Sequence, residues 1–203
     1  MPEGPADDRF VHLSDVLPTA WQAVEYAAIP KGGTVVVLGL GPIGDMASRI
    51  AQHHGARVLA VDLVVGMEAH GSPTAKFLQT VTALLPDAVG APLTKKAGID
   101  RLAALLSAID IVRRGGTISV IGVYGGAADP LPLVTMFDKQ IQLRMGQANV
   151  LRWVDDIMPL LVDEDPLGVD TFATHHLPLA DAPHAYEIFQ QKEDGAVKIV
   201  LHP

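Results

Sequence analysis

The 203-residue chain contains no cysteine, only 5% aromatic residues, and no apolar run long enough to cross a membrane as a helix. The absence of cysteine excludes a disulfide framework and a cysteine-ligated zinc site. The first eight residues, Met-Pro-Glu-Gly-Pro-Ala-Asp-Asp, are polar and acidic and lack the apolar stretch of a secretory signal. We therefore expect a cytoplasmic protein that does not interact with membranes.

Basic residues are also scarce in this chain. Lysine and arginine number 15 against 23 acidic residues, so the net charge is −8, and no basic cluster stands out. Nucleic acid is not an expected partner, because binding its phosphates requires a basic surface. Hydrophobic residues, in contrast, make up 49% of the chain. This composition predicts an extensive core or interface within roughly one large domain.

The most informative segment is the apolar run Val35–Leu38, which is followed by Gly39, Gly41 and Gly44 in G-x-G-x-x-G spacing. A helical pattern comes next, and a second apolar run ends in Asp62. Each glycine has a mechanical role in this arrangement. The first permits a tight turn, the second lets the backbone approach a pyrophosphate, and the third allows close packing of helix on strand.

The same segment predicts how a dinucleotide would be held. The helix N-terminus offers free N–H groups and a positive dipole end to phosphates, so Pro42 and Ile43 belong to the predicted cofactor-binding turn. Asp62 would accept hydrogen bonds from a ribose diol and repel a 2′-phosphate, which favours NAD over NADP. Asp45 would repel the pyrophosphate, so we expect its side chain to point away. The alternative interpretation is a glycine-rich turn in an unrelated α/β protein.

Hydrophobic periodicity predicts alternating strands and helices, which is typical of an α/β protein with a doubly wound parallel sheet. Strands are expected at 34–40, 57–63, 117–123, 141–146 and 197–201. Helices are expected at 43–53, 100–114, 150–162 and 181–191, after a short N-terminal helix that Ser14 or Asp15 would cap. Pro159 should bend or divide the helix at 150–162.

Four further segments carry a family resemblance: 13–19, 115–126, 145–149 and 193–201. With the glycine turn, they resemble the zinc-dependent alcohol dehydrogenases of the medium-chain dehydrogenase/reductase family, in particular the formaldehyde-dehydrogenase-like branch. The segments occur in the family's order and cover nearly all of the chain. The resemblance implies an oxidoreductase that transfers a hydride between a small alcohol or aldehyde and NAD, with assistance from zinc.

The resemblance also implies roles for single residues. Asp15 occupies the position of the third ligand of the catalytic zinc, although a helix cap is the alternative interpretation for it. Thr19 occupies a position near the nicotinamide. The remaining positions that would contact the cofactor are Ile121, Gly122, Val123, Gln147, Asn149 and Lys198.

Two departures from the family affect the expected chemistry. The family's N-terminal catalytic domain, which supplies a cysteine and a histidine to the zinc, has no counterpart in this sequence. A catalytic zinc needs three protein ligands and an open position, so Asp15 alone cannot hold one and zinc is not expected here. The elements that should follow Asp62 are also missing, so the nucleotide-binding domain looks deleted near 63–66.

The deletion would remove the strand that normally lies between the first and fifth strands of the sheet. Unpaired backbone groups in a buried sheet each cost about 1–3 kcal/mol. We therefore expect 34–40 and 117–123 to pair directly. The alternatives are that 63–65 extends the second strand or fills the vacant position, or that the gap stays open.

These observations predict three regions and two functional classes. Residues 1–30 form a lead-in and linking helix, 31–147 a truncated Rossmann-like domain, and 148–203 a C-terminal remnant of the catalytic domain. The chain is either an NAD-dependent oxidoreductase by ancestry with impaired activity, or a non-catalytic nucleotide-binding or oligomerising remnant. The family's pairing of subunits through sheet edges makes a homo-oligomer an expectation, with Ile141–Met145 as the candidate edge.

Eight histidines suggest a metal site. The adjacent pairs His53–His54 and His175–His176 lack the i, i+4 spacing of a helical zinc site, and neighbouring residues on an extended segment point to opposite faces. We therefore expect no metal site among the histidines.

Overall fold

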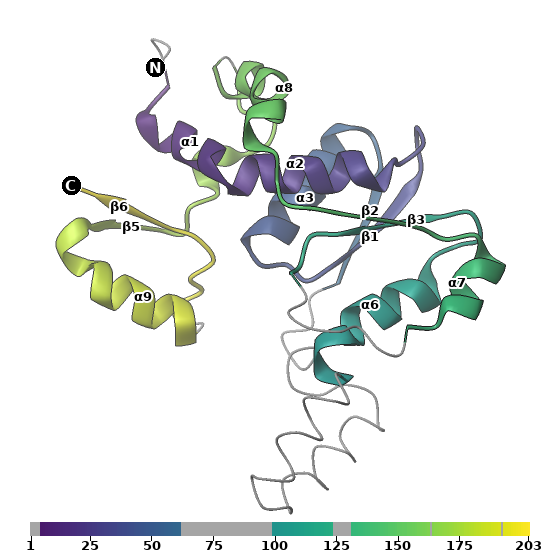
Figure 1. Ribbon diagram of the computed structural model, residues 1–203. Helices are drawn as coiled ribbons and strands as arrows, with labels where there is room; N and C mark the ends of the chain where they lie inside the picture. Colours follow the sequence, from purple (N-terminus) through teal and green to yellow (C-terminus); the bar gives the residue numbers. More distant parts are fainter. Residues whose placement is uncertain (1–4, 62–98, 124–130, 163, 192) are drawn as a thin grey trace, which may run out of the picture. The chain divides into compact units, whose positions relative to one another are not determined.

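The structure is a computed structural model that describes residues 5–61, 99–123, 131–162, 164–191 and 193–203 (Figure 1). The chain divides into two compact units. The larger unit comprises residues 1–60 and 147–203, and the smaller unit comprises residues 61–146. None of the helices within the described ranges is long and apolar enough to cross a membrane.

The larger unit contains most of the described elements. Its helices are α1 (Asp7–Val11), α2 (Val16–Ala27), α3 (Pro42–His53), α8 (Val150–Val162) and α9 (Ala182–Gln191), with short 3-10 turns η1 (His12–Ser14), η2 (Val169–Thr171) and η3 (Leu179–Asp181). Its strands are β1 (Thr34–Leu38), β2 (Arg57–Val61, at the unit boundary), β5 (His175–Pro178) and β6 (Ile199–His202).

The core of the larger unit forms where α2 packs against α3 and α8. Leu17 of α2, Ile50 of α3 and Ile157 of α8 are completely buried, and alanines on α2 and α3 allow the two helix backbones to approach closely. Trp153, Ile157 and Leu161 recur every four residues, so they share one buried face of α8. The helix runs undivided through Pro159, so of the two expected effects of this proline, division is wrong and bending stays a prediction.

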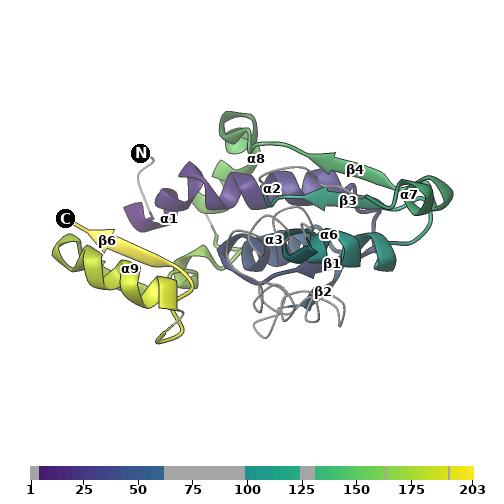
Figure 2. The same ribbon diagram turned by 60° about the horizontal axis from the view of Figure 1, so that its bottom comes forward.

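Two pairs of strands belong to this part of the chain. β1 is hydrogen-bonded to β2, as the glycine motif predicted. β5 and β6 pair in parallel, from His175 opposite Ile199 to Pro178 opposite His202, and α9 lies alongside them (Figures 1 and 2). The sequence analysis did not predict β5, because His-His-Leu-Pro is short and lacks the β-branched residues that mark strands.

The smaller unit is built from α6 (Ile99–Ile111), β3 (Thr117–Val120), α7 (Leu133–Lys139) and β4 (Gln142–Met145). β3 and β4 pair in parallel, and Leu105 and Ile109 of α6 pack with Ile118 in a separate core. The Lys139 ammonium donates to the carbonyls of Ile109 (2.8 Å) and Asp110 (2.7 Å), so it satisfies acceptors at the C-terminus of α6. This helix ends at Ile111, three residues before the predicted end, and α7 was not predicted.

β1 pairs with β2, and β3 pairs with β4. Each strand thus pairs with its neighbour in sequence, which is the common arrangement. The expected direct pairing of the first strand with 117–123 stays a prediction, because β1 belongs to the larger unit and β3 to the smaller one. Residues 62–71, where the other two alternatives would be decided, lie outside the described ranges.

The contact of α3 with the turn after β1 depends on Gly44. A Cβ atom added there would lie 1.8 Å from the Gly39 carbonyl oxygen and 3.5 Å from Val37 Cγ1. The obstructing atom is backbone, so no rotamer change can relieve the clash. Close packing of helix on strand at this glycine is therefore confirmed.

We expect Gly44→Ala to lower the free energy of unfolding by about 1–3 kcal/mol or more, because the helix must move away from the turn. Gly41→Ala is the matched control, since an added Cβ at Gly41 meets no protein atom within 4 Å. Urea denaturation of both variants measures the difference. Equal stability of the two variants would contradict the packing described here.

Candidate functional site

The glycine turn connects β1 to α3 and has the conformation that its residues require. Gly39 has φ of +92°, a left-handed conformation in which a side chain would be strained. Gly41 stands at the N-cap of α3 with an extended backbone (φ −65°, ψ −177°), and Pro42 is the first helical residue. A proline suits this position, because its fixed φ is helical and its missing N–H would have had no helical acceptor.

The start of α3 leaves two backbone amides for an anion. The first helical hydrogen bond runs from the Asp45 N–H to the Gly41 carbonyl (3.0 Å). The N–H groups of Ile43 and Gly44 therefore precede the regular hydrogen-bonding pattern of the helix. Because no atom of the described residues would lie within 4 Å of a Cβ at Gly41, there is room within this part of the chain for a ligand to approach the backbone. This arrangement is able to bind a phosphate group.

The carboxylate of Asp45 is directed along α3 toward Arg49. Asp45 Oδ2 lies 3.0 Å from both Nε and Nη2 of Arg49, one turn further along the helix. Arg49 also donates from Nη1 to the Gly168 carbonyl (2.8 Å), which links α3 to the loop before η2. The ion pair offsets the charge of Asp45 and fixes its side chain, in agreement with the expectation that it points away.

The loop at 147–149 is held against α2 by Gln22, a buried residue that the sequence analysis did not single out. Gln22 Nε2 donates to the Gln147 carbonyl (2.9 Å), and Gln22 Oε1 accepts from the Asn149 N–H (3.0 Å) and from Trp153 Nε1 (3.2 Å). A polar residue on the apolar face of a predicted helix was the available signal, because buried amides almost always have partners.

The side chains of Asp15 and Thr19 are hydrogen-bonded to each other. The Thr19 hydroxyl donates to Asp15 Oδ1 (2.9 Å), and Asp15 stands at the N-cap of α2 without a side-chain capping bond to the backbone. Asp15 belongs to no group of three ligand side chains within the described part of the chain. One exposed carboxylate does not hold a catalytic zinc, so the family's metal does not fit at this position.

The other predicted cofactor residues fall in different parts of the structure. Ile121, Gly122 and Val123 follow β3 in the smaller unit and are exposed. Lys198 precedes β6 in the larger unit, and its carbonyl accepts from the Thr174 N–H (2.8 Å). Asp62 lies outside the described residues. The described part of the larger unit therefore contains the glycine turn, Thr19, the 147–149 loop and Lys198.

His12 is a buried histidine in the same unit. Its side chain is 2% exposed, its ring makes an edge contact with Phe172, and its Nδ1 has no hydrogen-bond partner among the described residues. Burial lowers the pKa of His12 to about 4, the charge of Lys198 acts in the same direction, and Asp8 opposes the shift. His12 is therefore neutral at physiological pH.

The fold is of the α/β type with a glycine turn between β1 and α3, and comparison with known proteins is more specific. No protein-family model matches the chain. It is 33% identical to an uncharacterized zinc-type alcohol dehydrogenase-like protein, AdhB, of Bacillus subtilis (97% of this chain, 60% of AdhB). It is 34% identical to a probable zinc-binding alcohol dehydrogenase of Mycobacterium tuberculosis (100% of this chain, 54% of that protein).

A solved structure shows the same similarity. The alcohol dehydrogenase TADH from Thermus sp. ATN1 superimposes with a TM-score of 0.76 at 29% identity, over the whole of this chain and 60% of that one. The chain is thus a relative of the zinc-type alcohol dehydrogenases that spans 54–60% of the length of these relatives. The family resemblance seen in the sequence is confirmed, and the branch named there stays a prediction. The AdhB match extends over 228 positions, more than the 203 residues here, so AdhB has residues without a counterpart in this chain.

We expect His12 to make the stability of the metal-free chain depend on pH. Its folded-state pKa of about 4 lies below the unfolded value of 6.5, so the unfolded chain takes up a proton first as the pH falls. The contribution is complete above about pH 6.5 and is lost progressively toward pH 4, by about 3 kcal/mol in total. Urea denaturation between these pH values, in the presence of EDTA, measures it.

His12→Phe should remove this part of the pH dependence while keeping the ring contact with Phe172. His184→Gln is the control, because the His184 side chain is exposed. If the wild-type chain and His12→Phe lost stability in parallel, the buried neutral histidine would not be the cause.

Proposed function

We propose that the chain binds NAD(H) at the glycine turn, as a nucleotide-binding unit of the alcohol dehydrogenase type. The observation that carries the proposal is the start of α3, where the Ile43 and Gly44 amides face an approach kept open by Gly41. A helix N-terminus with free amides favours a pyrophosphate through both hydrogen bonds and the helix dipole. The ribose diol of the cofactor is assigned to Asp62, and a phosphate contact to Lys198.

The nicotinamide is assigned to Thr19 and the 147–149 loop of the larger unit. Gln22 is proposed as a positioning residue, because it fixes the Gln147 carbonyl and the Asn149 amide through two hydrogen bonds. Fixed carbonyl and amide groups of this kind are suited to orient a carboxamide. The proposal places the protein in the cytoplasm, as the composition predicts.

We also propose that this chain by itself is impaired as an alcohol or aldehyde oxidoreductase. Asp15 is hydrogen-bonded to Thr19 and has no companion ligands among the described residues. The polarisation of the substrate oxygen that zinc-type relatives obtain from their metal therefore has no assigned source here. Binding and orientation of the cofactor are the functions that the chain's own residues support.

A second candidate function is a non-catalytic oligomerising module. It is favoured by β4, which pairs with β3 along one edge and exposes Met145 to the extent of 56%. A strand at the edge of a two-stranded sheet that exposes an apolar side chain is able to add a strand from a second chain. Light scattering with a Met145→Lys variant separates this function from nucleotide binding.

We expect NAD(H) to bind at least about tenfold more tightly than NADP(H), a difference of about 1.4 kcal/mol, because Asp62 would repel the 2′-phosphate. Isothermal titration with both cofactors measures the preference. Asp62→Ala should reduce it without abolishing NAD(H) binding. Tighter binding of NADP(H) by the wild-type chain would contradict the assignment of Asp62.

Gly41→Val should weaken both cofactors by more than about tenfold, because the side chain occupies the space through which the pyrophosphate approaches. Gly41→Ala should have a smaller effect of the same sign. Both variants should unfold at the wild-type urea concentration, since a Cβ at this position meets no atom of the described residues within 4 Å. Unchanged affinity in a folded Gly41→Val variant would exclude the glycine turn as the binding site.

We expect NAD-linked oxidation of small alcohols, and the reverse reduction of aldehydes, to remain at background for the chain alone. Formation of NADH, followed by its absorbance, is the measurement, with and without added Zn²⁺. Robust zinc-dependent turnover would refute the proposed impairment, whereas it would leave the NAD(H) assignment intact.

A further inference from the structure

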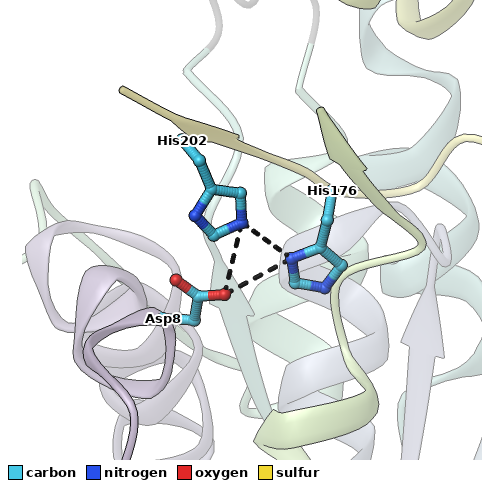
Figure 3. A group of neighbouring side chains, drawn as sticks. All are labelled: Asp8, His176 and His202. Carbon is cyan, nitrogen blue, oxygen red and sulfur yellow. Dashed lines mark hydrogen bonds and ion pairs between the residues drawn. The ribbon is translucent and has the colours of Figure 1, made fainter. Parts of the chain in front are cut away.

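Three ligand-type side chains from distant parts of the sequence converge in the larger unit (Figure 3). Asp8 lies on α1, His176 on β5 and His202 on β6, and their polar ends point toward one another. The sequence analysis expected no metal site, because it compared histidines only with their neighbours in sequence. The parallel pairing of β5 with β6 creates the cluster. His176 is opposite Val200, and His202 is two residues further along the same face.

The three ligand atoms form a nearly equilateral triangle. His176 Nδ1 lies 3.2 Å from His202 Nε2, and Asp8 Oδ2 lies 3.4 Å from the first nitrogen and 3.5 Å from the second. Two ligands bound at about 2.1 Å to a tetrahedral zinc ion are about 3.4 Å apart. The triangle therefore has the dimensions of one face of a zinc tetrahedron.

The two ring nitrogens, 3.2 Å apart, are within hydrogen-bonding distance of each other. The contacts of the carboxylate with both rings, at 3.4 and 3.5 Å, exceed the usual hydrogen-bond range of about 2.7–3.2 Å. The two rings are stacked, with centroids 5.5 Å apart and planes inclined by 20°. A single ion in the middle of the triangle would satisfy all three atoms at once.

His12 provides an independent observation. It lies one helical turn after Asp8 and lines the same small pocket, of about 140 Å³, as Asp8 and His176. Its side chain is 2% exposed, and its Nδ1 is without a partner among the described residues. A buried nitrogen without a protein partner is usually satisfied by a bound water molecule or an ion. The pocket is too small for a dinucleotide, since cofactor pockets measure about 300–1,000 Å³.

Neighbouring contacts fix the position of α1 at this pocket. Arg9 makes a two-pronged ion pair with Asp170 and donates from Nη1 to the Leu161 carbonyl (2.9 Å). Asp165 in turn accepts from the Val169 and Asp170 N–H groups (2.7 and 2.8 Å). These contacts fix the helix that carries Asp8. The positive charge of Lys198, which acts on His12, opposes cation binding at the pocket.

We propose that Asp8, His176 and His202 bind one divalent transition-metal ion, with Zn²⁺ as the best match, through Oδ2, Nδ1 and Nε2. Two imidazoles and a carboxylate are ligands typical of such ions, and the fourth position opens to the solvent. The site connects α1, near the start of the larger unit, with β6, which ends at His202. It is separate from Asp15 and does not depend on the proposed NAD(H) function.

The test uses the full chain without a histidine tag, stripped with EDTA. Isothermal titration with Zn²⁺ should show one ion per chain, and Mg²⁺ under the same conditions should not bind, because it prefers oxygen ligands. Zn²⁺ should also raise the Tm of the chain. Absence of zinc binding, or equal binding of Mg²⁺, would overturn the proposal.

Single variants identify the ligands. The affinity for Zn²⁺ should fall by more than about tenfold in each of Asp8→Asn, His176→Gln and His202→Gln, since each removes one of three ligands. His175→Gln is the matched control, because the neighbouring ring of His175 contacts Thr174 and Asp194 instead. Unchanged binding in the His176 and His202 variants would place the ion elsewhere and refute the proposal.

Nuclear magnetic resonance of the wild-type chain covers the case in which a variant does not fold. Zinc should shift the ring-nitrogen resonances of two histidines, one bound through Nδ1 and one through Nε2. A shift at His53 and His54 alone would also refute the assignment.

Discussion

The packing of α2 between α3 and α8 is the interaction on which the larger unit depends. Leu17 and Ala20 on α2 are completely buried, and they contribute to one core with α3 and α8. Burial of a leucine side chain contributes about 1.5–3 kcal/mol, so a face of several such residues determines where the helix lies. The same helix carries Gln22, which fixes the 147–149 loop, and Thr19 near its start. The hydrophobic constraint therefore positions polar groups that the core itself does not need.

The sequence was sufficient for the features that depend on local contacts. The turn from β1 into α3 was predicted, because the positive φ of Gly39 and the close packing at Gly44 depend on backbone geometry within a few positions. The limits of α8 were predicted as well, because its buried residues recur at helical spacing. These features are encoded in short windows of sequence, and the larger fold does not have to be known to find them.

Features that depend on long-range pairing were not predicted. The His-His-Leu-Pro segment forms β5 only because Ile199–His202 lies beside it, and nothing in the segment indicates that partner. The pairing of the first strand with 117–123 stays a prediction for a related reason. Unpaired backbone groups have a cost, but local patterns do not determine which strand satisfies them. Gln22 was missed because its partners are more than a hundred residues away.

One physical rule leads to opposite conclusions for two parts of this chain. A metal site in a protein requires several ligands that converge on one point, so the identity of a single ligand residue carries little weight. The family resemblance assigns Asp15 to the catalytic zinc. Its carboxylate, however, is hydrogen-bonded to Thr19 and has no further ligand side chains near it in the described structure. Asp8, His176 and His202 are not implied by the family resemblance, but the fold brings their ligand atoms within 3.5 Å of one another. Relationship to a family therefore predicts the glycine turn, which the structure contains, whereas metal chemistry in this chain is better argued from the convergence of side chains.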